Sequence, residues 1–432
     1  MGDVTRNIGL SLGADICWPL CYEHLMRKLD LRIPLTALGQ GGGDGDSVRF
    51  HVERVSIEPF DLRQPVKYDV VIDRLTHWYH TSREWIKKGV LMNDLYVFNN
   101  PWSVQSMEKH TSYCAMMELG MPIPETWMIP PKEYEPGNPD LKPTLGKYAK
   151  LFDLGKIGQR LGYPVFMKPY DGGGWRAVTK ADDEKALWKT YEDSGKAVMH
   201  VQAGVNGYDR FVRCIGFGPQ TYSVLYDPSA PLHDRYTPQG QGWGGPAATK
   251  PFLSKEEEEH LRRITLTINS FFGWEFNSCE SLRKNGVWYP IDYANPCPDS
   301  QVTSLHYHFP WLVKAYLRWS VFCAATDRKM RRTLDWDPYY AIAAQEGMSF
   351  EEKLAAYGRI ADQRFETERF EEFCQRHLPH LDEVAWEFFG TPEAKDAVRQ
   401  KVTALFPAHE IEKFTELFWG RIQNWRRDQK AA

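Results

Sequence analysis

Short apolar runs and one helical pattern alternate along the first hundred residues. β-branched and other apolar residues form runs typical of strands, each ended by glycine, proline or charged residues. The predicted strands are residues 7–13, 48–55, 67–74 and 95–101. Between the first two, leucines at helical spacing predict a helix over residues 20–29. This alternation predicts a small α/β lobe.

The patterns that follow divide the rest of the chain. A helix is predicted over residues 103–119, opened by a serine cap and closed by a glycine. Residues 120–155 are rich in proline and glycine, which indicates a junction between lobes. A second α/β segment follows to about residue 300, and amphipathic helical patterns dominate from about residue 309 to the end. The expected divisions are residues 1–100, 101–305 and 306–432.

Composition and charge restrict the classes of function. The 432 residues carry a net charge of −4 with a pI near 6.4, so the chain has no general attraction for nucleic acid or anionic membranes. Its eight cysteines show no Cys-x-x-Cys spacing, which is typical of a reduced protein without a disulfide framework or zinc site. Neither a membrane span, a secretory signal nor a myristoylation signal is apparent. We expect a cytoplasmic protein that binds neither nucleic acid nor membranes.

The strongest chemical signal is the segment YPVFMKPYDGGGWRAVTK at residues 163–180. Lys168 stands at the end of an apolar strand, and a second β-prone run returns after a glycine-rich turn. The three glycines of the turn are Gly172, Gly173 and Gly174. Such a turn brings amide N–H groups close to phosphate oxygens, and the lysine adds a positive charge. A purely structural hairpin is the alternative, so support is needed from elsewhere in the chain.

That support comes from a second hairpin, at residues 277–299. Two β-prone segments joined by a Lys-Asn-Gly turn place Glu280 and Asp292 on adjacent strands, with Asn295 just beyond. Two carboxylates and an amide oxygen suit one or two Mg²⁺ ions that bridge nucleotide phosphates. The alternative is a surface hairpin with solvated acids. Asp292 lies between apolar residues, however, where an unpaired charge is costly.

With these motifs in this order, the chain resembles the ATP-grasp ligases, such as ribosomal-protein glutamate ligases, glutathione synthetases and D-alanine:D-alanine ligases. The resemblance runs from about residue 68 to about residue 300. It implies an ATP-grasp fold of the α/β (α+β) class, with a Rossmann-like N-terminal lobe and a helical C-terminal extension. The stretch VFNNPWSVQSMEKHTSYCAMMELGMPIPETW resembles the family's lysine-bearing helix, which makes Lys109 the first nucleotide-binding lysine. Lys168 is then the second, and the three glycines form the phosphate loop.

The resemblance also implies a nucleotide pocket. Residues 198–218 resemble the linker between the family's two nucleotide-binding lobes, followed by an acid that would hold the ribose, here Asp209. The backbone that would contact the adenine edge is that of Gln202, Ala203 and Val205. In the family an arginine usually follows the acid by two residues, where this chain has Phe211. Strand alternation puts Arg213 on the same face as Asp209, so we assign the transition-state role to Arg213.

Two further matches are less regular. The glycine-rich stretch that follows residue 236 resembles the family's large loop, in which Gln239 or Gln241 would face nucleotide and substrate. The family's metal motif commonly ends in acid-x-Asn, whereas Asp292 and Asn295 are three residues apart. Either a β-bulge returns Asn295 to the metal, or the role of Asn295 is weakened.

The reaction implied by the resemblance uses ATP and one or two Mg²⁺ ions, for which Mn²⁺ can substitute. A substrate carboxylate attacks the γ-phosphate to give an acyl-phosphate and ADP, and an amine then displaces phosphate to form an amide. Lys109 and Lys168 would position the phosphates, while Arg213 would stabilise the oxyanion. The expected partners are small-molecule carboxylate and amine substrates or a peptide acceptor, and a homodimer is compatible with the pattern.

Two other functions share these residues. An ATP-grasp phosphotransferase would phosphorylate a hydroxyl, and a non-catalytic scaffold would bind a nucleotide without turnover. A scaffold has no physical need for a cluster of acids, which disfavours that alternative. Asp299 and residues 306–308 follow the metal hairpin, where they would either contact the second substrate or only cap and pack. Asp15 and Trp18 lie in the first loop of the N-terminal lobe, where the family often binds a substrate.

Overall fold

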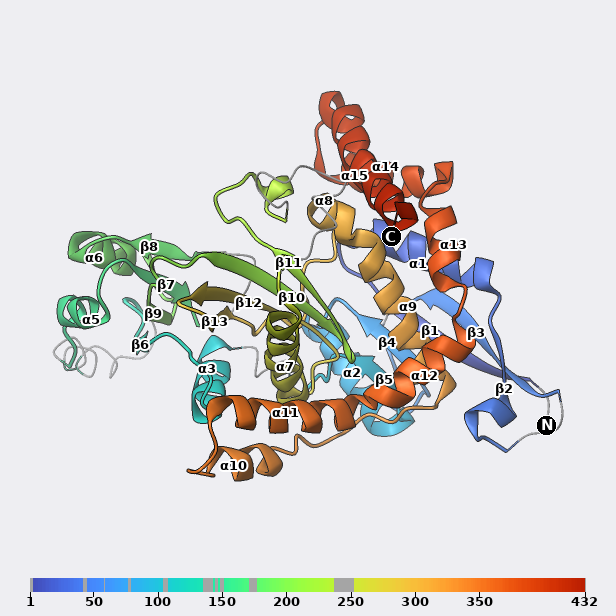
Figure 1. Cartoon of the computed structure of the whole chain (residues 1–432), viewed down its shortest axis with the longest axis horizontal. Helices are drawn as coiled ribbons and strands as arrows, with labels where there is room; N and C mark the ends of the chain where they lie inside the picture. The colour runs from blue at the N-terminus through green and yellow to red at the C-terminus, as the bar shows by residue number, and fades with distance from the viewer. Residues whose placement is uncertain are drawn as a thin grey trace.

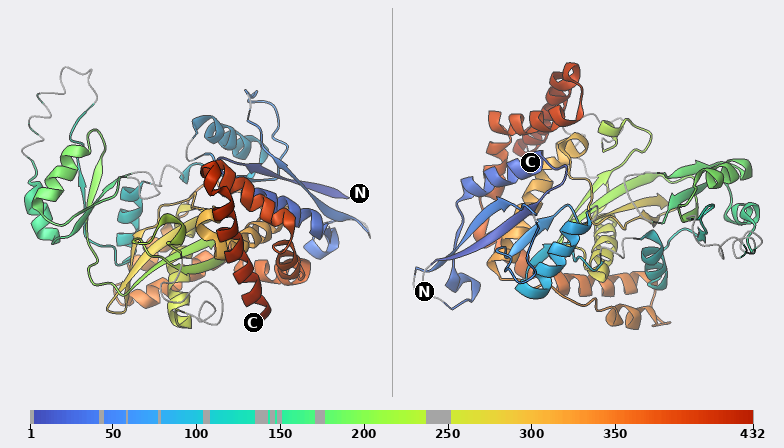
Figure 2. Two further views of the ribbon diagram at one scale, coloured as in Figure 1. Left: turned by 90° about the horizontal axis from the view of Figure 1, so that it is seen from above. Right: turned by 180° about the vertical axis from the view of Figure 1, so that it is seen from behind.

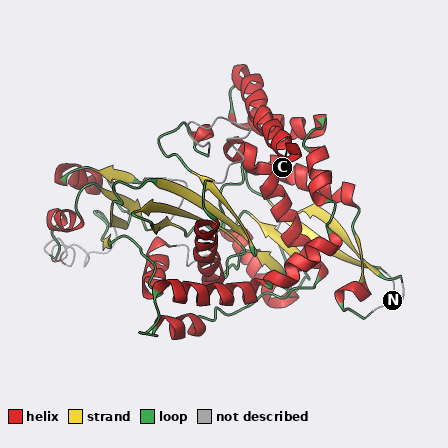
Figure 3. Ribbon diagram, in the orientation of Figure 1, coloured by secondary structure: helices red, strands yellow, loops and turns green. Residues whose placement is uncertain are grey.

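Three β-sheets follow one another along the long axis of the molecule in the computed structural model (Figure 1). A five-stranded sheet lies towards one end, a four-stranded sheet with two short helices forms the other end, and a second four-stranded sheet lies between them. Figure 3 shows that helices surround the central sheet and dominate the C-terminal part. The structure describes residues 3–41, 45–57, 59–76, 79–103, 108–134, 143, 147, 151–170, 177–236 and 252–431.

The N-terminal lobe is a mostly parallel sheet with the order β2-β3-β1-β4-β5. Its elements are β1 (Val4–Ser11), α1 (Cys17–Leu29), β2 (Arg32–Pro34), η1 (Leu35–Leu38), β3 (Ser47–Arg54), β4 (Val70–Asp73), α2 (His80–Asn93) and β5 (Tyr96–Phe98). β1 pairs in parallel with both β3 and β4, so the strand order reverses between β1 and β4. Their carboxyl ends, where Ser11 and Asp73 are register partners, mark the edge at which open α/β sheets bind ligands.

The small lobe is a separate antiparallel sheet with the order β6-β9-β7-β8. Helix α3 (Lys109–Glu118) leads into it. Its elements are β6 (Thr126–Ile129), α5 (Leu154–Leu161), β7 (Val165–Pro169), β8 (Thr179–Ala181), α6 (Glu184–Asp193) and β9 (Met199–Ala203). Alternate residues of β7 and β9, including Val165, Met167 and Val201, pack with α5 and α6 in a core of their own. Seen from above, this lobe projects away from the rest of the molecule (Figure 2).

The central sheet is antiparallel throughout, with the order β11-β10-β12-β13. Its elements are β10 (Arg210–Phe217), β11 (Gln220–Leu225), η3 (Leu232–Asp234), α7 (Lys255–Phe272), β12 (Phe276–Lys284) and β13 (Val287–Asp292). α7 begins with a capping box formed by Ser254 and Glu257 and packs against β10, β11 and β12. Asn285 and Gly286 both have positive φ, as the predicted two-residue hairpin turn between β12 and β13 requires.

The C-terminal part is helical. Its elements are α8 (Val302–Leu305), η4 (His306–His308), α9 (Phe309–Ala325), α10 (Asp337–Ala343), α11 (Phe350–Phe365), α12 (Thr367–His377), α13 (Leu381–Phe388), α14 (Pro392–Leu405), η5 (Ala408–Glu410) and α15 (Ile411–Ala431). α9 packs against β1, β4 and β10, and α14 packs against α1, α8 and α15. One hydrophobic core therefore joins the N-terminal sheet, one face of the central sheet and the C-terminal helices.

The structure confirms the mixed α/β class and corrects two local expectations. Helix α3 begins at Lys109, whereas the sequence predicts a start at Ser103. The Ser103 hydroxyl donates to the Asn100 carbonyl and does not cap α3. The predicted junction at residues 120–155 contains strand β6, which pairs with β9. In the described part of the chain, no helix is both long and apolar enough to cross a membrane.

Gly218 provides a test of the packing between the central sheet and α9. Its φ is +55°, and a Cβ there would lie 2.4 Å from Trp319 Cδ2. We expect Gly218→Ala to lower the free energy of unfolding by about 2–5 kcal/mol, because left-handed backbone costs an alanine ~1–2 kcal/mol and overpacking adds ~1–3 kcal/mol. Gly286→Ala is the control, since its φ is +80° but its Cβ would meet nothing within 4 Å. Equal shifts of the two unfolding midpoints would contradict the packing.

Candidate active site

Five charged side chains from distant parts of the sequence meet between the small-lobe sheet and the central sheet. They are Lys109 at the start of α3, Lys168 on β7, Arg213 on β10, Glu280 on β12 and Asp292 at the end of β13. All are buried except Asp292, whose side chain is 25% exposed. The three cations and two carboxylates of the predicted phosphate and metal sites are thus brought together.

The two carboxylates are direct cross-strand neighbours. Glu280 on β12 pairs in register with Asp292 on β13, and a β-bulge follows, because Ser281 pairs with Pro290 and leaves Ile291 without a partner residue. The bulged Ile291 carbonyl accepts hydrogen bonds from Lys168 Nζ at 3.1 Å and from the Tyr113 hydroxyl at 2.8 Å. The bulge therefore ties the carboxylate pair to β7 and α3.

Both lysines contact this carboxylate hairpin. Lys109 Nζ lies 3.3 Å from Asp292 Oδ1, and the Lys109 backbone N–H donates to the Tyr170 carbonyl at 2.7 Å, just beyond β7. Lys168 Nζ also donates to Gln202 Oε1 at 2.7 Å. Burial lowers the pKa of Lys168 to about 8, even though Asp292 favours its charged form. Burial and the adjacent Asp292 raise the pKa of Glu280. The site is therefore a largely buried, closely spaced set of charges.

Arg213 faces the carboxylates from the neighbouring strand. It is the register partner of Glu280, and its Nη1 donates to the hydroxyl of Tyr236. Burial opposes its charge, but Tyr236, Glu280 and Asp299 outweigh this, and the pKa of Arg213 lies above its ordinary value. Within the described residues, Arg213 Nε and Nη2 have no hydrogen-bond partner although they are buried. Those donors are available to a bound anion.

The residues present fit a magnesium ion. Glu280 Oε2 is buried and has no hydrogen-bond partner among the described residues. Asn295 lies nearby in the same hairpin region, where its Nδ2 donates to Ser278 Oγ at 3.2 Å and its backbone N–H donates to Asn277 Oδ1 at 2.9 Å. An unpaired buried carboxylate oxygen beside a second carboxylate matches the hard oxygen donors that Mg²⁺ prefers. No third histidine, cysteine or acid joins this group in the described part of the chain.

The predicted adenine-contacting residues lie at the end of β9. The Gln202 side chain bridges Lys168 and the Thr126 hydroxyl. The backbone N–H groups of Ala203 and Gly204 already donate to the Glu125 and Pro164 carbonyls. Of the three predicted positions, Val205 is the one that lies beyond the strand pairing.

The structure describes the predicted ribose-binding acid but not the predicted loop residues. Asp209 is exposed at the open end of β10, where Arg283 Nε donates to it at 3.1 Å. A nucleotide that uses Asp209 would have to share it with Arg283. Gly172, Gly173 and Gly174 of the phosphate loop lie outside the described residues, as do Gln239 and Gln241 of the large loop.

Sequence reasoning missed Tyr236 and His200. Tyr236 is buried, and its carbonyl accepts a hydrogen bond from His308 Nε2 at 3.2 Å, so residues after the metal hairpin hold the partner of Arg213. His200 on β9 is the register partner of Lys168 and stacks on His110 with ring centroids 5.7 Å apart. The alternation of β9 could have placed His200 on the face opposite Val201, but its neighbours come from distant segments.

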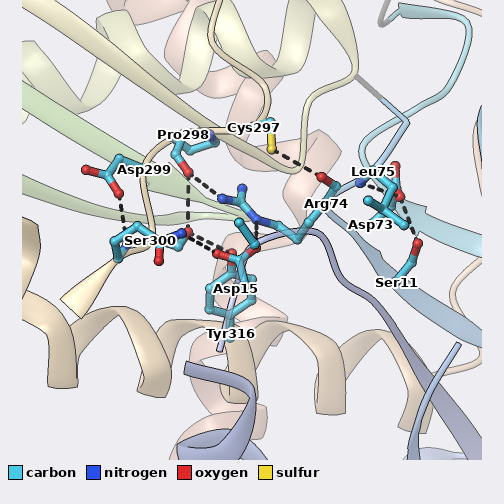
Figure 4. A network of polar contacts seen from close by, with 12 residues as sticks. Ser11, Asp15, Asp73, Arg74, Leu75, Cys297, Pro298, Asp299, Ser300 and Tyr316 are labelled. Carbon is cyan, nitrogen blue, oxygen red and sulfur yellow. Dashed lines mark hydrogen bonds and ion pairs between the residues drawn. The ribbon is translucent and has the colours of Figure 1, made fainter. Parts of the chain in front are cut away.

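A polar network links this region to the N-terminal lobe (Figure 4). Arg74 Nε donates to Asp15 Oδ2 at 2.8 Å, and its Nη2 donates to the Pro298 carbonyl at 2.9 Å. Both side chains are buried. Trp18 is buried as well and stacks on Tyr316 with centroids 4.2 Å apart, which is a packing role. Asp15 is thus the member of the predicted first-loop pair that carries polar contacts.

Comparisons with known proteins place the chain beside ligases. No family model matches it. It is similar to the alpha-aminoadipate–LysW ligase LysX of Saccharolobus solfataricus, with 26% identity over 154 residues, 34% of this chain and 53% of that protein. The chain thus spans about half the length of this curated relative. The resemblance to carboxylate–amine ligases that the motifs predict is confirmed at this level.

Similar solved structures include the VanG D-Ala:D-Ser ligase from Enterococcus faecalis, with 12% identity, a TM-score of 0.46, and coverage of 83% of this chain and 99% of that chain. A RimK domain ATP-grasp protein from Sphaerobacter thermophilus shows 14% identity, a TM-score of 0.42, and coverage of 68% and 92%, respectively. A D-alanine–D-alanine ligase from Bacillus anthracis, solved with ATP, shows 12% identity, a TM-score of 0.44, and coverage of 84% and 99%.

Acid sensitivity provides a test of the buried His200. Burial, followed by the charges of His110 and the two lysines, lowers the pKa of His200 to about 4. A depressed folded-state pKa contributes stability that is present above the unfolded value of about 6.5 and is lost as pH falls towards 4. Between pH 7 and pH 4.5, the free energy of unfolding of His200→Phe should fall by about 2–3 kcal/mol less than that of the wild type. Chemical denaturation at the two pH values measures this difference. His380→Phe, at an exposed position, should track the wild type, and parallel profiles for all three proteins would refute the buried neutral state.

Proposed function

We propose that this chain is an ATP-dependent ligase that forms an amide bond through an acyl-phosphate, converting ATP to ADP and phosphate. The observation that carries the proposal is the arrangement of the Glu280–Asp292 pair with three cations, which come from α3, β7 and β10. Within the part of the chain that the structure describes, Glu280 Oε2 and two nitrogens of Arg213, Nε and Nη2, have no hydrogen-bond partner. A magnesium–nucleotide complex supplies a cation for the first and phosphate oxygens for the second.

In the first step, a substrate carboxylate oxygen attacks the γ-phosphorus of ATP, and ADP leaves. Lys109 and Lys168 approach from α3 and β7, so they would hold the phosphates between the lobes as the bond to the leaving oxygen breaks. Mg²⁺ held by Glu280 and Asp292, with Asn295 as a further oxygen donor, would neutralise the charge that develops on the phosphates. Mn²⁺, another oxygen-preferring ion, would be accommodated by the same donors.

In the second step, an amine attacks the acyl carbon, and phosphate leaves. The developing oxyanion needs donors that are already in place, because reorganising them during the reaction would add to the barrier. Arg213 fits this role, since its Nη1 is held by Tyr236 while Nε and Nη2 stay available.

The nucleotide base would lie beside the end of β9, near Gln202, Ala203 and Val205, with Asp209 at the ribose. This assignment is supported by the position of Gln202, whose side chain already contacts Lys168. The likeness to a ligase named for alpha-aminoadipate and LysW supports a small amine as the second substrate, and a peptide acceptor is compatible with it. A cytoplasmic setting and a homodimer are compatible with this proposal.

Removing the carboxylate pair should abolish metal-dependent nucleotide binding. We expect the double variant Glu280→Gln/Asp292→Asn to lose Mg-ATP binding in isothermal titration and to release ADP at least about 100-fold more slowly over a panel of carboxylic acids and amines, as expected when an electrostatic contribution of about 3 kcal/mol is lost. Glu256→Gln, on the exposed first turn of α7, is the control and should behave as the wild type.

The same assay separates the rival reactions. ADP and phosphate released only when a carboxylic acid is present would support the ligase. Formation of a phosphorylated hydroxyl compound without release of free phosphate would indicate a phosphotransferase instead of the ligase. An absence of Mg-ATP binding to the wild-type protein would overturn the proposed enzymatic activity altogether.

Tyr236 should act as a positioning residue for Arg213. Tyr236→Phe removes the hydroxyl that fixes Nη1, and we expect kcat to fall about 10-fold, since one such hydrogen bond contributes ~1–2 kcal/mol. The Kd of Mg-ATP should stay within about twofold, because the lysines and carboxylates are unchanged. Tyr339→Phe removes a buried hydroxyl bonded to Ser270 in another core and is the control. A parallel loss of nucleotide binding in Tyr236→Phe would show a general packing defect instead.

A further inference from the structure

A small cavity lies where the N-terminal sheet, the start of the central sheet and the C-terminal helices meet. Tyr96 of β5 and Glu275, which precedes β12, line it together with residues from the segment after α9 and from α11 and α12. Its volume is about 170 Å³, below the roughly 300–1,000 Å³ of pockets for drug-sized ligands. Among the described residues that line it is none of the five charged side chains of the candidate active site. The cavity is therefore separate from that site and is sized for a small molecule or ion.

Positive charge dominates the lining of this cavity. Two carboxylates line it, against five cations among the described residues. The cations are Arg328, Lys329, Arg331, Arg364 and Arg369. Because the walls of a cleft have a low dielectric constant, they focus the field of a single sign of charge and raise the local concentration of small ions of the opposite sign.

Three of the five cations have acidic partners at the rim. Glu366 accepts hydrogen bonds from Arg328 Nη1 and from Arg369 Nη1, the second at 2.6 Å. Lys329 Nζ lies 3.1 Å from Asp327 Oδ1, and Asp327 is in turn shared with an arginine of β1. Each of these carboxylates thus serves two cations, so the rim retains an excess of positive charge.

Arg364 carries the donors that point to a ligand. Its side chain is 8% exposed, and its Nε is buried without a hydrogen-bond partner among the described residues. Nη2 donates to Glu275 Oε1 at 3.2 Å, whereas Nη1 forms no hydrogen bond in the same part of the chain. A buried donor without an acceptor costs free energy, so the contacts of the fold alone leave this guanidinium incompletely satisfied.

Arg331 is a second lining cation with unused donors. Its carbonyl accepts a hydrogen bond from Asn100 Nδ2 at 3.3 Å, which ties its backbone to the segment just beyond β5. Its side chain forms no hydrogen bond or ion pair within the described ranges of the chain. The next residue, Arg332, does not line the cavity and pairs with Asp94 instead. Two neighbouring arginines therefore differ in whether they have an acid to bind.

We propose that this cavity binds a small phosphate-bearing anion, either inorganic phosphate or a compact phosphomonoester, through Arg364 and Arg331. A guanidinium presents a planar pair of donors that matches two phosphate oxygens. A phosphoryl group carries a charge of about −1.5 to −2 at pH 7, which would compensate both arginines. The inference does not depend on the proposed ligase. A bound anion would join the N-terminal lobe, the central sheet and the C-terminal helices at one point.

Titration of the full chain with two phosphate compounds tests the site. Isothermal titration without nucleotide, at constant ionic strength, should give a Kd of about 1 mM or below for inorganic phosphate or for O-phosphoserine. Tighter binding of phosphate would identify the free ion as the ligand, and tighter binding of O-phosphoserine would identify a phosphomonoester. Tighter binding of succinate, a dicarboxylate, than of either compound would overturn the assignment to phosphate.

Two variants locate the binding. Arg364→Lys keeps a charge for Glu275 but removes the unused guanidinium donors, and we expect it to raise the Kd at least about 10-fold. Arg331→Gln should have an effect of the same size, and it remains informative if Arg364→Lys does not fold, because it breaks no side-chain contact among the described residues. Arg332→Gln is the matched control and should bind phosphate as the wild type does.

A third variant separates this cavity from the candidate active site. Lys168→Met should retain a phosphate site whose Kd is within about twofold of the wild-type value, since Lys168 does not line the cavity. Phosphate binding that is lost in Lys168→Met but kept in Arg331→Gln would place the phosphate in the active site and overturn the inference. Equal binding by the wild type and both cavity variants, or no binding by the wild type, would overturn it as well. None of these outcomes bears on the binding of Mg-ATP, so the ligase is tested independently.

Discussion

Two carboxylates placed directly opposite each other on neighbouring strands are the constraint around which the centre of this molecule is built. Like charges in cross-strand register repel, and Glu280 is also removed from water. The arrangement is tolerable only if cations approach from several directions. β10 supplies Arg213 beside Glu280, and α3 supplies Lys109 beside Asp292. The bulge at Ile291 then turns a carbonyl towards Lys168 of the other sheet. The hairpin, both lobes and the helix start thus satisfy one electrostatic requirement.

The hydrophobic cores are divided between the lobes. The small lobe keeps a core of its own, whereas the N-terminal sheet, one face of the central sheet and the C-terminal helices share another. The seam between sheets is therefore not sealed by apolar packing, and polar side chains such as Lys168 and Gln202 occupy it. In the proposed reaction, a nucleotide would enter there by exchanging hydrogen bonds, without breaking a core.

Local patterns in the sequence predicted the carboxylate hairpin well. The Asn285–Gly286 turn fixes the register of β12 and β13 as far as Ser281 and Pro290. The bulge at Ile291 then brings Asp292 opposite Glu280. The start of α3 was predicted six residues too early, because Ser103 looks like a cap but bonds locally. Tyr236 has no local signature of its partner. Arg213 is 23 residues from Tyr236, so tertiary packing brings the pair together.

Because these charges compensate one another, the effect of a substitution depends on the charges that remain. Removing Glu280 alone leaves Arg213 and Lys168 facing each other's charge with less compensation, so its effect includes a penalty that is not the contribution of Glu280 itself. Removing Glu280 and Asp292 together removes their repulsion as well, and the two single effects should not add. Coupling energies from double-variant cycles, rather than single losses, therefore measure how far the cations and the two carboxylates act as one site.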